Sequence, residues 1–290
     1  MKPPPFSYHA PASVQEAVSL LASLENARVL AGGQSLLPML NMRFATPDHV
    51  IDITRIPELS GISVHDDEVV IGAMTRQREL EFSSEIGEYL PLMHEALQFV
   101  GHRQTRNRGT IGGSLCHLDP AAELPCVAAA HDAIVEVVSD AGAREIPFAE
   151  FPLGYLTPAI EPGEMVRAIR FPRWPKQAGA AFVEFARRHG DFAIVSAAAL
   201  ILLGDGGVVE RASLTLGGVG SGPMRMHDIE IGLAGQPFTS DAIKSAADAC
   251  GAIEIDDDPY TPAHYRKHLC RTLAGRALET AASRAGWSRP

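Results

Sequence analysis

Helical and extended hydrophobic patterns alternate along the first fifty residues. The segment Ser13-Val-Gln-Glu16 is typical of a capped helix start, and Ser35 stands where a second helix can begin. The pattern predicts, in order, a helix over 13–24, a strand over 28–31, a helix over 36–43 and a strand over 49–53. These elements make an α/β unit in which a glycine turn follows the first strand. Ligands bind at that end of strands in α/β sheets.

The middle of the chain mixes short strands and helices. Alternating or apolar runs predict strands over 68–73, 133–139 and 165–171. We expect Thr75 to cap a short helix and a longer helix to cover 89–100. Residues 102–108 are interpreted as a polar loop that leads into a second glycine segment, and 119–130 as an Ala-rich apolar stretch.

The last third of the chain predicts an antiparallel sheet followed by helices. Apolar runs predict strands over 181–188, 192–203 and 208–218. The turn Gly204-Asp-Gly-Gly207 would join the last two strands as a hairpin. The pattern after Met226 is helical, and we expect the longest helix over 260–285.

The Pro/Gly-rich segment 172–179 is the expected domain boundary. With 290 residues, the chain suits about two domains at about 150 residues each. We therefore expect an α+β fold. The expected domains are 1–175, divided into an α/β subdomain 1–55 and a second subdomain 56–175, and a sheet-plus-helix domain 176–290.

Composition and charge narrow the class of protein. Hydrophobic residues make up 46% of the chain and charged residues 21%, as in ordinary folded proteins. Lys and Arg number 25 against 35 Asp and Glu, and the net charge of −10 disfavours nucleic acid as the main ligand. We expect no membrane span, because no apolar run approaches about 18 residues. The first residues do not resemble a signal peptide, so we expect a cytoplasmic protein.

The cysteines favour thiols over metal ligands. None of them forms a CxxC pair, which iron–sulfur and structural zinc sites usually contain. We expect buried thiols and no metal site at Cys116, Cys126, Cys250 and Cys270.

Two Gly-Gly segments are the main candidates for chemistry. Adjacent glycines let the backbone approach a ligand, and their N–H groups can bind an anion. Two such segments suit a diphosphate, although either could be only a tight turn or a bulge. The first segment comprises Ala31, Gly32, Gly33, Gln34 and Ser35, and the second comprises Thr110, Ile111, Gly112, Gly113 and Ser114.

Charged residues follow or precede the second glycine segment. Asp119 and Glu123 can accept hydrogen bonds from sugar hydroxyls, or can interact with a helix dipole. Arg103, Arg106 and Arg108 can hold a phosphate, face a partner protein or belong to a solvated loop.

The motifs AGGQSLLPMLNMR, RNRGTIGGSLCHLDPAAELP, RRHGDFAIVSAAA and LTLGGVG together resemble the medium, FAD-binding subunit of molybdenum hydroxylases. This family includes carbon-monoxide dehydrogenase, quinoline oxidoreductase and, as a fused domain, xanthine dehydrogenase. The resemblance covers nearly the whole chain. It implies a two-part FAD-binding domain of the vanillyl-alcohol-oxidase type, with non-covalent FAD.

The resemblance also assigns residues. It implies that Ala31–Ser35 and Thr110–Ser114 bind the FAD diphosphate and that Glu123 contacts the ribityl chain. Ile160 would lie near the adenine, and Asp191 and Phe192 would approach the isoalloxazine.

The function implied by the resemblance is electron transfer. A large molybdopterin subunit would oxidise the substrate, and a small subunit with two [2Fe–2S] clusters would pass electrons to FAD on this chain, in a dimer of three-chain units. FAD would then reduce an external acceptor, so the cofactor carries the chemistry and this chain needs no catalytic residue of its own. The alternatives are a self-contained flavin oxidase or reductase and a non-catalytic nucleotide-binding subunit.

Overall fold

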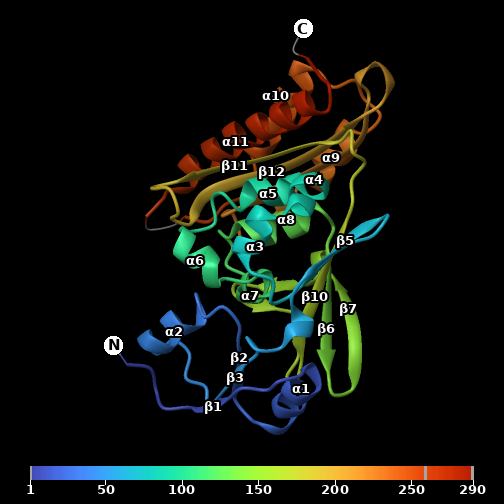
Figure 1. Ribbon diagram of the computed structural model, residues 1–290. Helices are drawn as coiled ribbons and strands as arrows, with labels where there is room; N and C mark the ends of the chain where they lie inside the picture. Colours follow the sequence, from blue (N-terminus) through green and yellow to red (C-terminus); the bar gives the residue numbers. More distant parts are fainter. Residues whose placement is uncertain (1, 258–259, 289–290) are drawn as a thin grey trace. The chain divides into compact units, whose positions relative to one another are not determined.

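The computed structural model describes residues 2–257 and 260–288, which form two compact units (Figure 1). The units interleave along the chain. Unit 1 comprises residues 2–83, 102–118 and 133–172, and unit 2 comprises 84–101, 119–132 and 173–288. The sequence-based division into domains 1–175 and 176–290 stays a prediction.

A parallel sheet of three strands forms the first part of unit 1, in the order β1-β3-β2. Its elements are β1 (Ser7–His9), α1 (Val14–Ser23), β2 (Ala27–Leu30), α2 (Leu36–Met42) and β3 (His49–Asp52). The Ser13 side chain caps α1 by accepting from the Glu16 N–H, as the sequence predicts. Ala17 and Val18 of α1 pack with Ile51 in a fully buried core. This lobe confirms the α/β unit expected from the first fifty residues.

An antiparallel sheet of five strands forms the second part of unit 1, in the order β4-β5-β10-β6-β7. Its strands are β4 (Ile62–Val64), β5 (Glu68–Gly72), β6 (Ile134–Ser139), β7 (Gly142–Pro147) and β10 (Met165–Pro172). The accompanying elements are η1 (Pro57–Leu59), α3 (Gln77–Phe82), α6 (Arg103–Arg108), α7 (Ile111–His117), η2 (Phe148–Glu150), β8 (Pro152–Gly154) and β9 (Thr157–Pro158).

Unit 2 is a four-stranded antiparallel sheet between two layers of helices (Figure 1). Its strands are β11 (Gly179–Ala186), β12 (Ala193–Leu203), β13 (Val209–Gly217) and β14 (Met224–Arg225), with η3 (Asp205–Gly207) in the hairpin. The helices are α4 (Ser84–Tyr89), α5 (Pro91–Ala96), α8 (Glu123–Ala130), α9 (His227–Leu233), α10 (Ser240–Cys250) and α11 (Ala263–Arg284). Helix α11 covers one face, while α5 and α8 cover the other.

Side-chain alternation explains these two faces. Gly179 lies against α11 so closely that a Cβ there would stand 1.8 Å from the Ala281 carbonyl oxygen. On the opposite face, the Ser213 hydroxyl donates to the Ala130 carbonyl of α8 at 2.7 Å. The three long strands of this sheet confirm the strands expected over 181–218.

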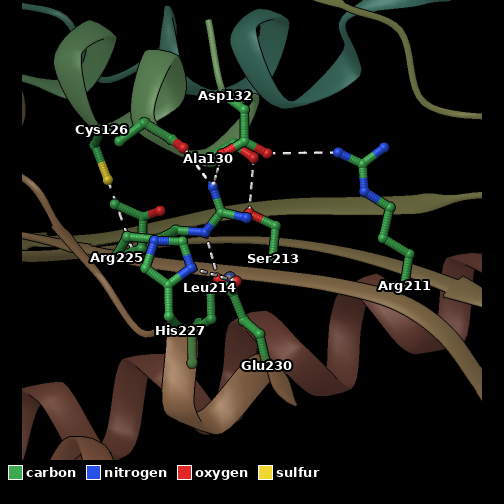
Figure 2. A network of polar contacts seen from close by, with 11 residues as sticks. Cys126, Ala130, Asp132, Arg211, Ser213, Leu214, Arg225, His227 and Glu230 are labelled. Carbon is green, nitrogen blue, oxygen red and sulfur yellow. Dashed lines mark hydrogen bonds and ion pairs between the residues drawn. The ribbon is translucent and has the colours of Figure 1, made fainter. Parts of the chain in front are cut away.

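A half-buried arginine, Arg225, connects α8, β13 and α9 in unit 2. The Arg225 guanidinium donates to the Asp132 carboxylate at 2.7 Å, to the Ala129 carbonyl at 2.6 Å and to the Glu230 carboxylate. Figure 2 shows Arg225 between Asp132 and Glu230. Glu230 also accepts from the Leu214 N–H at 2.7 Å. The buried Glu230 carboxylate and the Arg225 guanidinium therefore satisfy each other's charge.

Four local expectations are wrong. Residues 103–108 form helix α6 instead of a loop, because Arg106 is anchored in the interior by a two-bond ion pair with Glu81, each bond 2.9 Å long. The helix expected over 89–100 is shorter, since α5 spans only Pro91–Ala96; Pro91 has no N–H to donate to the preceding turn, which separates α5 from α4. Ser35 precedes α2 but makes no side-chain capping bond. Thr75 exchanges hydrogen bonds with the backbone of Gly61 instead of capping α3.

No helix in residues 2–257 and 260–288 combines the length and the apolar character needed to cross a membrane. The four cysteines are free thiols in the structure. Burial raises the pKa of the Cys126 thiol to about 12, which leaves it unreactive at neutral pH.

Candidate cofactor-binding site

The first glycine segment lies at the carboxyl end of β2, where the chain turns into α2. Gly33 has a φ of +73°, a conformation that glycine adopts without strain. Among the described residues, the backbone N–H groups from Gly32 to Leu36 donate no hydrogen bond. Five successive unpaired donors in a glycine turn are the arrangement that binds anions through the backbone.

The second glycine segment differs from the anion-binding turn that the sequence predicts, because it forms the first turn of helix α7. The Thr110 hydroxyl caps the helix by accepting from the Gly113 N–H at 3.1 Å. The other N–H groups of this turn are also paired: Ile111 donates to Thr75, Gly112 to Ala73 and Ser114 to Thr110. Within this segment only the Thr110 N–H donates no hydrogen bond to the described residues, so the segment lacks the run of free donors that the first segment has.

The glycines of the second segment serve close packing. A Cβ on Gly112 would lie 2.6 Å from the Ala73 Cβ, so any larger residue would separate α7 from the chain that follows β5. A Cβ on Gly113 would lie 2.8 Å from the Thr110 hydroxyl and 3.7 Å from the Ala31 Cβ. Gly113 thus faces the first glycine segment.

The two glycine segments adjoin within unit 1. Gly32 packs on the backbone of Arg108 and Gly109, just before α7. Nearby, the Arg76 side chain donates to the same Arg108 carbonyl. The structure thus places a polypeptide turn with unpaired N–H groups beside two arginines.

Glu123, Asp191 and Phe192 belong to unit 2, whereas Ile160 belongs to unit 1. Glu123 is the first residue of α8 and is buried. Asp191 closes a turn by donating its N–H to the Arg188 carbonyl, and the Phe192 side chain is 60% exposed. Ile160 follows β9 and is half-buried.

Unit 2 contains a second acidic residue beside Glu123. Glu184 lies on β11, and burial together with the nearby Glu123 charge raises its pKa to about 8. Its Oε2 atom has no hydrogen-bond partner among the described residues, nor has the Thr215 hydroxyl on the same face of the sheet. The Glu184 carboxyl is therefore held in its protonated form near neutral pH.

Sequence reasoning missed Arg76 and Glu184. Glu184 carries a signal, since it interrupts an apolar strand at a position that faces inward. Arg76 carries no such signal in the sequence, because its contact with the glycine segment depends on Arg108, which is distant in the chain.

Comparisons with known proteins identify the family of this chain. Residues 4–174 match the family model described as the FAD binding domain in molybdopterin dehydrogenase. Residues 180–281 match the CO dehydrogenase flavoprotein C-terminal domain.

Curated and solved relatives match over nearly the full chain. The 6-hydroxypseudooxynicotine dehydrogenase complex subunit alpha of Paenarthrobacter nicotinovorans is 43% identical, with 98% of this chain and 97% of the relative covered. Carbon monoxide dehydrogenase from Hydrogenophaga pseudoflava gives a TM-score of 0.94 at 40% identity, covering 98% of this chain and 99% of that one. Quinoline 2-oxidoreductase from Pseudomonas putida 86 gives a TM-score of 0.94 at 33% identity, covering 99% and 100%.

These matches confirm the resemblance carried by the glycine motifs and the α+β fold of an FAD-binding domain followed by a sheet-plus-helix domain. The chain belongs to the FAD-binding medium subunits of molybdenum hydroxylases, which are subunits of multi-subunit dehydrogenase complexes.

Proposed function

We propose that this subunit binds FAD without a covalent bond and passes electrons from iron–sulfur clusters of a partner subunit to an external acceptor. The observation that carries the proposal is the run of unpaired N–H groups from Gly32 to Leu36. A diphosphate satisfies such donors, and the glycines leave room for its oxygens. The residues present therefore fit a dinucleotide cofactor.

The chain's own residues would hold and orient the cofactor. Gly32 to Ser35 would donate backbone hydrogen bonds to the diphosphate, with Thr110–Ser114 packed beside them. Glu123 would accept hydrogen bonds from the ribityl hydroxyls, and Ile160 would contact the adenine. Asp191 and Phe192 would border the isoalloxazine. Bound FAD supplies the redox chemistry, since it exchanges electrons in one-electron and two-electron steps.

The partner subunits are what the family resemblance implies, and the cysteine content of this chain agrees with it. A [2Fe–2S] cluster takes about four cysteine ligands, so two clusters need about eight, and this chain has 4. We propose a small subunit with two [2Fe–2S] clusters and a large molybdopterin subunit that oxidises the substrate. Two such three-chain units would associate as a dimer. We also propose a cytoplasmic location, where the four free thiols would stay reduced.

An absorbance spectrum of the purified chain tests the cofactor. Two flavin bands are expected, and acid precipitation should release the yellow colour into the supernatant. A colourless chain that does not take up added FAD would favour a non-catalytic nucleotide-binding subunit. Colour that stays in the pellet would show a covalent flavin and contradict this part of the proposal.

Activity of the isolated and co-expressed chains tests the electron-transfer role. The FAD-loaded chain alone should not oxidise aromatic heterocycles, aldehydes or carbon monoxide. Co-expression with the two partner subunits should give a complex that does oxidise its substrate, as size exclusion and activity assays would show. Turnover by the isolated chain would favour the self-contained flavin oxidase.

A further inference from the structure

Arg76 lies at the start of α3, next to the first glycine segment in unit 1. Its Nη1 atom donates to the carbonyl oxygen of Arg108. The same oxygen lies against Gly32, where a Cβ would stand 2.2 Å from it. One carbonyl group therefore connects the Arg76 guanidinium with the turn that carries the unpaired N–H groups.

The charge of Arg76 is not neutralised by an ion pair among the described residues. The two carboxylates whose charges act on Arg76, Glu79 and Asp52, have other hydrogen bonds. Asp52 accepts from the Tyr8 hydroxyl at 2.6 Å and from the Thr54 N–H at 2.9 Å. Glu79 accepts from the backbone N–H of Arg76 itself, at 3.1 Å.

A second cation stands close to Arg76. Burial, followed by the charge of Arg108, lowers the pKa of the Arg76 guanidinium, while Glu79 and Asp52 oppose that shift. Arg108 is exposed and also has no ion pair among the described residues. Two neighbouring guanidinium groups without an anion repel each other, and a phosphate placed between them removes that cost.

We propose that Arg76, assisted by Arg108, supplies the cationic part of the cofactor site and pairs with the diphosphate at Gly32–Ser35. The inference rests on the proposed FAD binding and deepens it. Backbone N–H groups orient the diphosphate but carry no net charge. A dinucleotide diphosphate carries two negative charges, and the two arginines match that number.

The other arginines of α6 do not share this role. Arg106 is buried and bonded to Glu81 through two nitrogen atoms, so its charge is already neutralised. Arg103 is exposed on the same helix and has no side-chain bond with the glycine segment. An Arg103 variant is therefore a matched control for loss of one positive charge.

The test compares FAD, which contains the diphosphate, with riboflavin, which lacks it. The flavin-free full chain is titrated with FAD and with riboflavin, and binding is followed by flavin fluorescence. Arg76→Gln keeps a donor for the Arg108 carbonyl and removes the charge. We expect it to weaken FAD binding about tenfold to hundredfold, the range of a charge-assisted hydrogen bond, and to leave riboflavin binding unchanged. Arg103→Gln should bind both flavins like the wild type.

Further variants guard against a folding defect. Arg76→Lys keeps the charge and should lose less affinity for FAD than Arg76→Gln. Arg108→Gln keeps the backbone carbonyl that contacts Gly32 and should weaken FAD binding without affecting riboflavin. The affinity of the wild type for FAD should also fall more steeply with added salt than that of Arg76→Gln.

Two results would overturn the inference. One is wild-type affinity for FAD in both Arg76→Gln and Arg108→Gln. The other is an equal loss of FAD and riboflavin affinity in Arg76→Gln, which would indicate a purely structural residue. A wild-type chain that binds inorganic pyrophosphate but not FAD would instead refute the proposed function, and Arg76→Gln would then test the anion site with pyrophosphate alone.

Discussion

Gly32 lies directly against the carbonyl group of Arg108, and a Cβ on Gly32 would stand 2.2 Å from that oxygen. The contact joins the turn after β2 to the end of α6, two segments distant in sequence. Both partners are backbone, so neither can move aside as a flexible side chain would. The candidate cofactor site in unit 1 depends on this close approach.

Gly32→Ala should therefore destabilise the protein. We expect a loss of about 1–3 kcal/mol, typical of overpacking, together with loss of bound flavin. Urea unfolding and flavin absorbance would measure both. Gly87→Ala is the control, because a Cβ on Gly87 in α4 meets no atom within 4 Å. It should be neutral or stabilising. Equal stability of Gly32→Ala and the wild type would contradict the close contact.

Gly33→Val should abolish FAD binding while most of the fold remains. Gly33 has a φ of +73°, which costs a β-branched residue about 1–2 kcal/mol, and its Cβ would press on the flexible Leu37 side chain. The turn would change shape, and with it the placement of its unpaired N–H groups. Circular dichroism and flavin content would distinguish the two effects. Gly33→Asn tolerates the positive φ and is the milder comparison. A valine variant that purifies with full flavin would show that this turn does not hold the cofactor.

The sequence correctly predicted the elements that depend on interactions between residues close together in the chain. The Ser13 hydroxyl caps α1 because it accepts from the Glu16 N–H only three residues away, and the apolar run of β12 is visible in the sequence. Adjacent glycines likewise indicated the turn at Gly32 and Gly33. These features need no knowledge of distant residues.

Elements that depend on long-range partners were missed. Helix α6 reads as a polar loop, because the bond of Arg106 to Glu81 comes from another helix. The pairing of the α7 N–H groups depends on the carbonyls of Ala73 and Thr75, so the second glycine segment seemed equivalent to the first. Arg76 became a candidate only when its carbonyl partner on Arg108 was known.

Arg225→Met should strongly destabilise unit 2. Removal of the guanidinium leaves the Glu230 carboxylate, which is 9% exposed, without the Arg225 cation (Figure 2). It also leaves the Ala129 carbonyl without that donor. Breaking a buried pair in this way costs about 3–5 kcal/mol. Chemical unfolding would give the change. As control, Arg271→Met removes an exposed pair with Asp248 and should cost less than about 1 kcal/mol. Similar losses in both variants would show that the Arg225 network is not a special source of stability.

Glu184→Gln should change how stability depends on pH. The Glu184 pKa is about 8 in the folded chain because of burial and the Glu123 charge, against about 4.3 for an unfolded glutamate. The other titratable group of α8 near Glu184 is the Cys126 thiol, which stays neutral because burial raises its pKa to about 12. At a pH between the unfolded-state and folded-state pKa of Glu184, the folded chain binds one proton that the unfolded chain does not. The free energy of unfolding therefore falls as pH rises from about 4.3 to about 8.

The glutamine side chain of Glu184→Gln does not titrate, so the variant lacks the decline in stability that Glu184 causes as pH rises. Between pH 5 and about pH 8.5, the free energy of unfolding of Glu184→Gln should rise relative to that of the flavin-free wild type by at least about 1 kcal/mol. Urea unfolding at a series of pH values would measure the difference between the two proteins, in which the other titrating groups cancel. Glu25→Gln, at an exposed position of unit 1, should follow the wild-type curve. Parallel curves for wild type and Glu184→Gln would show that Glu184 is ionised in the folded chain. The unpartnered Oε2 atom would then need a donor such as bound water.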